Sequence, residues 1–135
     1  MIDILIIGND PGLRLLVEKE GVNVCIYSDE IQALTAAKDS AFAIVLLSYD
    51  VRKDETPEYI ALLTQANQTS KVVLIGQGLA DEIVIDCLMN GAQGYISAAE
   101  LPKFIDKMVN VLQSGEVWVT RRMAAKILER LREVL

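Results

Sequence analysis

The chain has 135 residues, 52% of them apolar and 24% charged, which suits one globular domain and argues against long disordered segments. Its net charge is −6, and residues 1–120 carry 8 Lys and Arg against 17 Asp and Glu, so we expect no nucleic-acid binding by the main body. The absence of histidine and of any Cys-x-x-Cys pair excludes histidine-based acid–base catalysis and argues against a soft-metal site.

Short runs rich in Val, Ile and Leu alternate with stretches of helical length along most of the chain. The predicted strands are Ile2–Ile7, Val22–Tyr27, Phe42–Leu47, Lys71–Ile75 and Gly94–Ile96. The predicted helices between and after them are Pro11–Glu20, Ser28–Asp39, Pro57–Ala66, Ala80–Asn90 and Glu100–Ser114. The strand runs are apolar throughout, as in strands that are buried on both faces.

Five β–α units in this order predict a three-layer α/β fold with a doubly wound, five-stranded parallel sheet. The expected strand order is 2-1-3-4-5, as in flavodoxin-like and CheY-like folds. Asp10 and Ser28 are predicted to cap the first two helices. Both cysteines, Cys25 and Cys87, are interpreted as small core residues of a protein in a reducing, cytoplasmic compartment. No apolar run approaches the ~18 residues that a membrane span needs.

An extra C-terminal helix is predicted beyond the five units. Thr120 is expected to cap it, and it carries apolar residues at helical spacing: Ile127, Leu128, Leu131, Val134 and Leu135. Its basic residues are interpreted as a solvated helix face, with contact to phosphates as the alternative: Arg121, Arg122, Lys126, Arg130 and Arg132. We therefore divide the chain into a main domain, residues 1–115, and a linker with an amphipathic helix, residues 116–135.

Three short motifs in the second half carry a resemblance to a known family. Gly91-Ala-Gln-Gly-Tyr-Ile96, Leu101-Pro102 and Gly115-Glu-Val-Trp118 occur in this order. Together they resemble the receiver domain of NarL/FixJ-type (LuxR-like) response regulators, and the likeness covers essentially the whole chain. In that family an aspartate accepts a phosphoryl group from a histidine kinase, with Mg²⁺ held by nearby carboxylates.

The resemblance places the family's reactive positions on residues that lack the required chemistry. The acidic pair falls on Gly8 and Asn9, the phosphoryl acceptor on Ser48, the hydroxyl position on Gly76, and the lysine position on Ala98. Mg²⁺ prefers carboxylate oxygens, and an aspartyl phosphate needs a carboxylate nucleophile. We therefore predict a degenerate receiver, a pseudo-receiver, that binds no metal or other cofactor and has no catalytic residue.

Two acids remain near this site, Asp10 and Asp50. They are interpreted as a helix cap and a loop acid, with a reshaped metal or phosphate site as the alternative. Tyr95, the family's aromatic of the fifth strand, is interpreted as a packed side chain.

The predicted fourth and fifth helices have more apolar residues than a core-facing stripe requires. Six of them form a candidate interface: Ile83, Met89, Leu101, Phe104, Met108 and Val111. Either the C-terminal helix folds back over this surface, or the surface forms a symmetric dimer.

The sequence thus predicts a non-enzymatic, phosphorylation-independent module for dimerisation or protein binding in a signal-transduction or transcription regulator. The expected partner is a second copy through the fourth and fifth helices. DNA would be reached only through a domain not present in this chain, and no membrane contact is expected. The alternative function is a small-ligand sensor that uses the vacated pocket, which should be neutral and roomier.

Overall fold

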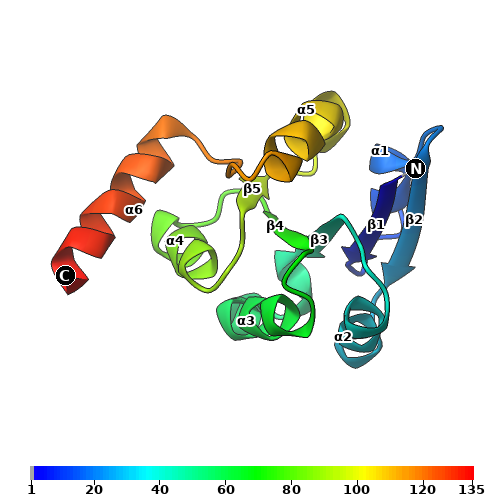
Figure 1. The fold of residues 1–135 in the computed structure, drawn as a ribbon, viewed down its shortest axis with the longest axis horizontal. Coiled ribbons are helices and arrows are strands. Elements are labelled where there is room, and N and C mark those ends of the chain that lie inside the picture. Colours follow the sequence, from blue (N-terminus) through cyan, green and yellow to red (C-terminus); the bar gives the residue numbers. More distant parts are fainter. Residues whose placement is uncertain (1) are drawn as a thin grey trace.

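The computed structural model describes residues 2–135, which form a five-stranded parallel sheet with helices on both faces (Figure 1). The strand order is β2-β1-β3-β4-β5, which confirms the predicted order. The strands are β1 (Ile2–Ile7), β2 (Val22–Tyr27), β3 (Ile44–Ser48), β4 (Lys71–Ile75) and β5 (Gly94–Ile96). Only β3 is displaced from its prediction: it begins at Ile44 and includes Ser48 at its carboxyl end.

Alternation along the strands sends side chains to two separate cores. Ile4 and Ile6 pack on one face with residues of α1 and α5, whereas Leu5 and Ile7 pack on the other with residues of α2 and α3. In Figure 1 these two pairs of helices lie on opposite sides of the sheet. The helices are α1 (Leu13–Val17), α2 (Glu30–Asp39), α3 (Thr56–Ala66), α4 (Asp81–Met89), α5 (Leu101–Gln113) and α6 (Arg121–Val134), with short 3₁₀ turns η1 (Tyr49–Val51) and η2 (Lys53–Glu55). The predicted three-layer architecture is confirmed.

The starts of the first two helices differ from prediction. Asp10 does not cap α1: its Oδ1 accepts from the amide of Gly12 at 2.8 Å and closes a turn, and α1 begins only at Leu13. Asp29, not Ser28, caps α2, because its Oδ1 accepts from the amides of Ile31 and Gln32, both at 2.9 Å. An N-cap side chain reaches the second and third helical amides, and Ser28 lies one residue too early for this.

The two cysteines lie in different environments. Cys87 on α4 is fully buried, as predicted, and burial raises the pKa of its thiol to about 12. Cys25 is exposed, so its assignment to the core was wrong. It lies on β2, an edge strand whose alternate side chains face outward.

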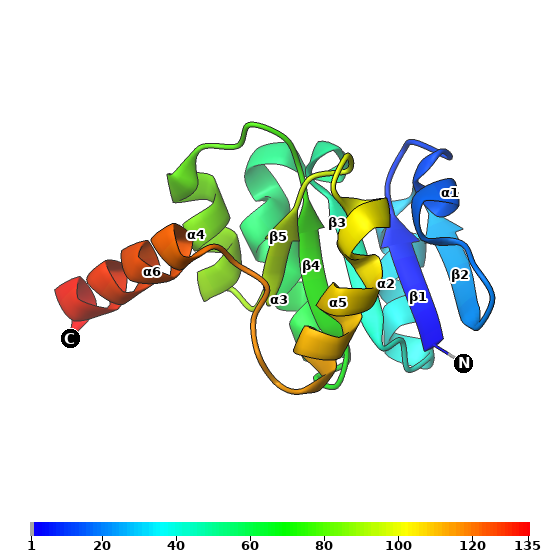
Figure 2. The ribbon, with the colours of Figure 1, turned by 90° about the horizontal axis from the view of Figure 1, so that it is seen from above.

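The segment after α5 returns to the sheet before α6 begins. Trp118 pairs with Gly94 in a parallel bridge: its amide donates to the carbonyl of Gln93 at 2.8 Å, and its carbonyl accepts from Tyr95 at 3.0 Å. Thr120 caps α6, as predicted, by accepting from the amide of Met123 at 3.1 Å. Figure 2 shows α6 beside α4 and extending past it, away from the sheet. The division after residue 115 stays a prediction.

None of the helices within residues 2–135 combines the length and the apolar character that crossing a bilayer requires.

Candidate functional site

A pocket of about 250 Å³ lies where β1, β3 and β4 end, the place at which this fold class binds ligands. We call it the rim pocket. Its lining residues are Asp10, Leu13, Ser48, Tyr49, Asp50, Ile75, Gly76, Gln77, Leu79 and Ala98. It therefore brings together five of the seven predicted site residues. Gly8 lies directly behind it, since a Cβ there would be 3.3 Å from the Cβ of Ser48, whereas Asn9 is exposed and does not line the pocket.

Two leucine side chains occupy the space beside the glycines of this pocket. A Cβ on Gly8 would lie 2.7 Å from Cδ1 of Leu13, and a Cβ on Gly76 would lie 2.6 Å from Cδ1 of Leu79. Both distances are shorter than any van der Waals contact, so neither position has room for a larger side chain unless its leucine moves. Leu13 and Leu79 thus fill the space immediately beside the two glycines, and the expectation of a roomier pocket stays a prediction.

The pocket is not neutral, because the carboxylates of Asp10 and Asp50 reach it. Asp10 is engaged by the Gly12 amide, and Asp50 is exposed in η1. Within residues 2–135, no three His, Cys, Asp or Glu side chains are grouped so as to hold a metal ion. Ser48 is half-buried at the end of β3, and with no histidine in the chain it lacks the usual base that would activate a hydroxyl.

The aromatic residues near the rim make packing contacts. The Tyr49 hydroxyl donates to Asp54 at 3.3 Å, and loss of solvent together with the Asp54 charge raises the pKa of Tyr49. Tyr95 on β5 packs against both the α2–α3 core and the cluster around Val84 on α4. These contacts agree with the interpretation of Tyr95 as a packed side chain.

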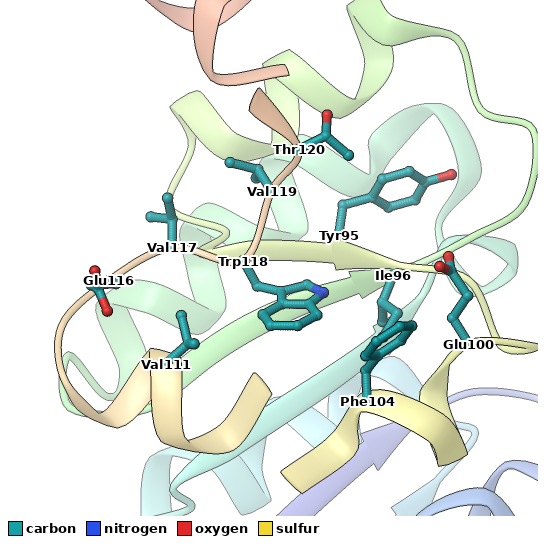
Figure 3. A pocket seen from close by; sticks show the side chains of 10 residues that line it. All are labelled: Tyr95, Ile96, Glu100, Phe104, Val111, Glu116, Val117, Trp118, Val119 and Thr120. Atoms are coloured by element: carbon teal, nitrogen blue, oxygen red, sulfur yellow. The ribbon is translucent and has the colours of Figure 1, made fainter. Parts of the chain in front are cut away.

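A second cavity, of about 410 Å³, lies between α5 and the returning segment; we call it the α5 groove (Figure 3). It is lined by Tyr95, Ile96, Glu100, Phe104, Val111, Glu116, Val117, Trp118, Val119 and Thr120. The rings of Phe104 and Trp118 face each other here, with centroids 5.9 Å apart and planes inclined by 49°. Trp118 thus covers Phe104. The expectation that α6 folds back over this residue was wrong.

The predicted interface residues separate into two groups. Leu101 and Met108 are fully buried in the core, so their assignment to an interface was wrong. The reason is that the apolar arc of α5 is wide, so that Leu101 and Met108 join Ile105 in the core under the helix. Met89 is 43% exposed, whereas Ile83, Phe104 and Val111 are half-buried. These four residues remain as the candidate surface.

Helix α6 is joined to α4 by ion pairs that were not predicted from the sequence. Arg122 and Lys126 donate to the carboxylate of Asp81 at 2.6 and 2.7 Å, and Arg130 lies 2.7 Å from Glu82 and 3.2 Å from Asp86. Hydrogen bonds from Arg122 and then Lys126 lower the pKa of Asp81 to about 2. Three basic residues of α6 are therefore paired with acids of α4, and only the rest of the predicted basic face is left to solvent.

Two signals in the sequence could have indicated this contact. The acidic body and the basic C-terminal helix are opposite in charge, and the three basic residues recur every four positions on one face. Sequence alone does not say which acidic helix they meet, because that depends on where residues 114–120 direct the chain.

Comparison with solved structures identifies the fold. The isolated receiver domain of RcsB from Salmonella enterica serovar Typhimurium is 16% identical, covers 96% of this chain and 99% of its own, and superposes with a TM-score of 0.80. A LuxR-family two-component response regulator from Aurantimonas sp. SI85-9A1 is 16% identical over 95% of this chain and 96% of its own, with a TM-score of 0.75. A LuxR-family DNA-binding response regulator from Silicibacter pomeroyi is 20% identical over 90% and 99%, with a TM-score of 0.73.

The chain therefore has the receiver-domain fold, as the resemblance in its sequence implied. No family model matches the sequence, and neither does any curated protein. At these identities the structural likeness concerns the fold alone.

Proposed function

We propose that this chain is a cytoplasmic, non-enzymatic regulatory module of a signal-transduction or transcription regulator, which acts through protein contacts and without phosphoryl transfer. The receiver-domain fold supports a regulatory role. The rim pocket supports independence from phosphorylation. We assign no DNA contact to these residues; DNA would be reached through a separate domain.

The observation that carries the proposal is the set of side chains that line the rim pocket. A receiver that takes a phosphoryl group needs carboxylates for Mg²⁺ and a carboxylate nucleophile. Here a serine ends β3, and the side chains of Leu13 and Leu79 occupy the space beside Gly8 and Gly76. Two apolar side chains at the mouth of an ion site disfavour a bound cation and a doubly charged phosphoryl group, because both lose hydration there.

Intact-mass measurement after incubation with Mg²⁺ and acetyl phosphate tests this part of the proposal. We expect no gain in mass, while a receiver domain with an acceptor aspartate, treated in parallel, gains a phosphoryl group. A stoichiometric gain that maps to Asp10 or Asp50 would contradict the proposal.

The protein contact is proposed to be a homodimer through α4 and α5. Support comes from apolar surface that the monomer leaves open: Met89 on α4 and the α5 groove beside Phe104 and Val111. Exposed apolar surface of this kind commonly marks a binding site. A two-fold dimer would bring the same surface of each copy together.

Met89→Glu is the sharpest test of that surface, because Met89 is exposed in the monomer and its replacement need not disturb the core. We expect weaker self-association in sedimentation velocity and an unchanged melting temperature. Leu15→Glu, at a residue of α1 that is 77% exposed, is the matched control and should leave association unchanged. A wild-type chain that stays monomeric at high concentration would contradict the homodimer.

The alternative role, sensing a small ligand in the rim pocket, has less support. The pocket is below the ~300 Å³ at which ligand sites usually begin, and the leucines already occupy its vacated space.

A further inference from the structure

The surface of α4 that faces α6 combines acidic and apolar side chains; we define the α4 patch as Asp81, Glu82, Ile85 and Asp86. Ile85 lies at its centre and is only 4% exposed. The three acids surround it, and each forms an ion pair with a basic residue of α6. The patch is therefore complementary to a basic amphipathic helix.

Helix α6 supplies the apolar half of the contact through its first two turns. Met123 is 5% exposed and forms a small buried cluster with Val84 and Ile85, against which Ile127 also packs. Beyond Ile127 the apolar residues are uncovered: Leu128 is 53% exposed and Val134 is 70% exposed. Figures 1 and 2 both show α6 lying against α4 and leaving it toward the C-terminus.

The charged half of the contact is accessible to water and salt. The side chains of Arg122, Lys126 and Glu82 are 64, 41 and 78% exposed. Exposed ion pairs each contribute little, and salt screens them over about one Debye length. Few side chains are buried in the contact, so it can open without unfolding the main domain.

A released α6 would not remain a stable helix by itself. It has 14 residues, and isolated helices of that length are marginal in water. Release would therefore expose the α6 amides to exchange and, at the same time, uncover Ile85 and the three acids of α4.

We propose that the α4 patch is a docking site for a basic amphipathic helix, that α6 occupies it as a salt-sensitive latch, and that α6 of a second copy can replace it. This inference deepens the proposed function, because it names the partner of α4 in an interaction module.

The second copy is the partner that the chemistry selects. Its α6 carries the same basic residues and the same Met123 and Ile127. When two copies exchange their α6 helices, the ion pairs and the apolar packing against α4 therefore form again in both copies. Exchange of an identical element between protomers is a low-cost route to a dimer. The hinge for this exchange lies between Trp118, which stays paired with Gly94, and Arg121, where α6 begins.

Two full-length variants with reversed charges test the proposal. In the tail variant, Arg122→Glu and Lys126→Glu place negative charge against Asp81. In the patch variant, Asp81→Lys places positive charge against the native α6. We expect each variant alone to lose protection of its α6 amides in hydrogen exchange, at least tenfold at Met123 and Ile127, while the β1 and β3 amides stay protected.

Mixing the two variants should restore what each has lost. The native patch of the tail variant accepts α6 of the patch variant, and the reversed patch accepts the reversed α6. We therefore expect a one-to-one heterodimer in native mass spectrometry, with α6 protected again. Placing all three substitutions in one chain should restore protection within the monomer.

Arg121→Glu with Arg132→Glu is the matched control. It makes the same change in net charge on the same helix, at basic residues that form no ion pair in the part of the chain described. Protection of α6 should stay at the wild-type level. Unchanged protection in the tail variant would overturn the latch, and a mixture that stays monomeric would overturn the exchange between copies. Neither result bears on phosphorylation or on Met89, which are measured separately.

Discussion

Different kinds of contact build the rim pocket and the side of the molecule formed by α4, β5 and α5. The rim is closed by single side chains, above all Leu13 and Leu79, that lie against glycines. The other side is built by the C-terminal segment, which adds a bridge to β5, an aromatic contact to α5 and ion pairs to α4. One region has apolar side chains packed against its glycines, whereas the other presents an open groove and ion pairs at the surface.

The largest expected effect comes from removing the aromatic contact on the binding side. Trp118→Ala deletes a half-buried ring that covers Phe104 and should cost about 2 kcal/mol of unfolding free energy, less than the ~3–5 kcal/mol for a fully buried Trp. Urea unfolding measures this cost. It should be followed by circular dichroism, because Trp118 is the only tryptophan and the variant has no tryptophan fluorescence to follow. Val117→Ala, at a neighbour that is 53% exposed, is the control and should cost under ~0.5 kcal/mol. Equal costs for the two variants would show that the indole does not support α5.

The rim can be tested by returning a carboxylate to it. Gly8→Asp puts a side chain where Cδ1 of Leu13 already lies, and we expect a cost of about 1 kcal/mol, at the low end for overpacking, because the flexible end of the leucine can move aside. Urea denaturation gives this difference. Asn9→Asp introduces the same acid one residue later at an exposed position, and should change stability by under ~0.5 kcal/mol.

A double-mutant cycle then identifies Leu13 as the cause. Leu13→Ala should cost less in the Gly8→Asp background than in the wild type, because the cavity that it leaves accommodates the new carboxylate. Simple additivity of the two costs would mean that the leucine does not fill the site.

Much of this architecture could be predicted from sequence, because a doubly wound sheet follows from the period and order of apolar runs. The strand order followed from that pattern, the Thr120 cap followed from its residue type before an amphipathic stretch, and the rim residues were located mainly through the resemblance to receiver domains. Leu13 and Leu79 were not predicted as pocket-filling residues, since ordinary core leucines give no sign of which glycine they will meet.

The interface was predicted less well for a related reason. Helical periodicity gives the direction of a residue around one helix, but not what covers it. Met108 and Phe104 therefore looked alike in sequence, although the core buries one and Trp118 covers the other. The ion pairs on α4 were missed because they join residues about 41–48 positions apart.

The pKa of Asp81 measures the α4–α6 contact directly. It is held at about 2, below the ordinary value, by Arg122 and Lys126. A depressed carboxyl pKa stabilises the docked state above the ordinary pKa near 4, and this contribution is lost as the pH falls toward 2. Carboxyl ¹³C NMR titration should show the pKa of Asp81 near 2 in the wild type.

Neutralising the two partners should move that titration toward its ordinary range. Arg122→Gln with Lys126→Gln should raise the pKa of Asp81 toward ~4, and Arg121→Gln with Arg132→Gln should leave it unchanged. A wild-type Asp81 that already titrates near 4 would mean that the ion pairs do not persist in solution.

The smallest expected effect is none at all. Ser48→Asp supplies the nucleophile at the end of β3, but the positions that would hold Mg²⁺ remain Gly8 and Asn9, and the cation position remains Ala98. A carboxylate without the metal and the lysine lacks the charges that stabilise the transferring group. Incubation of this variant with Mg²⁺ and acetyl phosphate should leave its intact mass unchanged. Detectable acyl phosphate would show that Asp10 or Asp50 can bind the Mg²⁺ ion. In that case the single substitution at residue 48 would be enough to make the rim pocket accept a phosphoryl group.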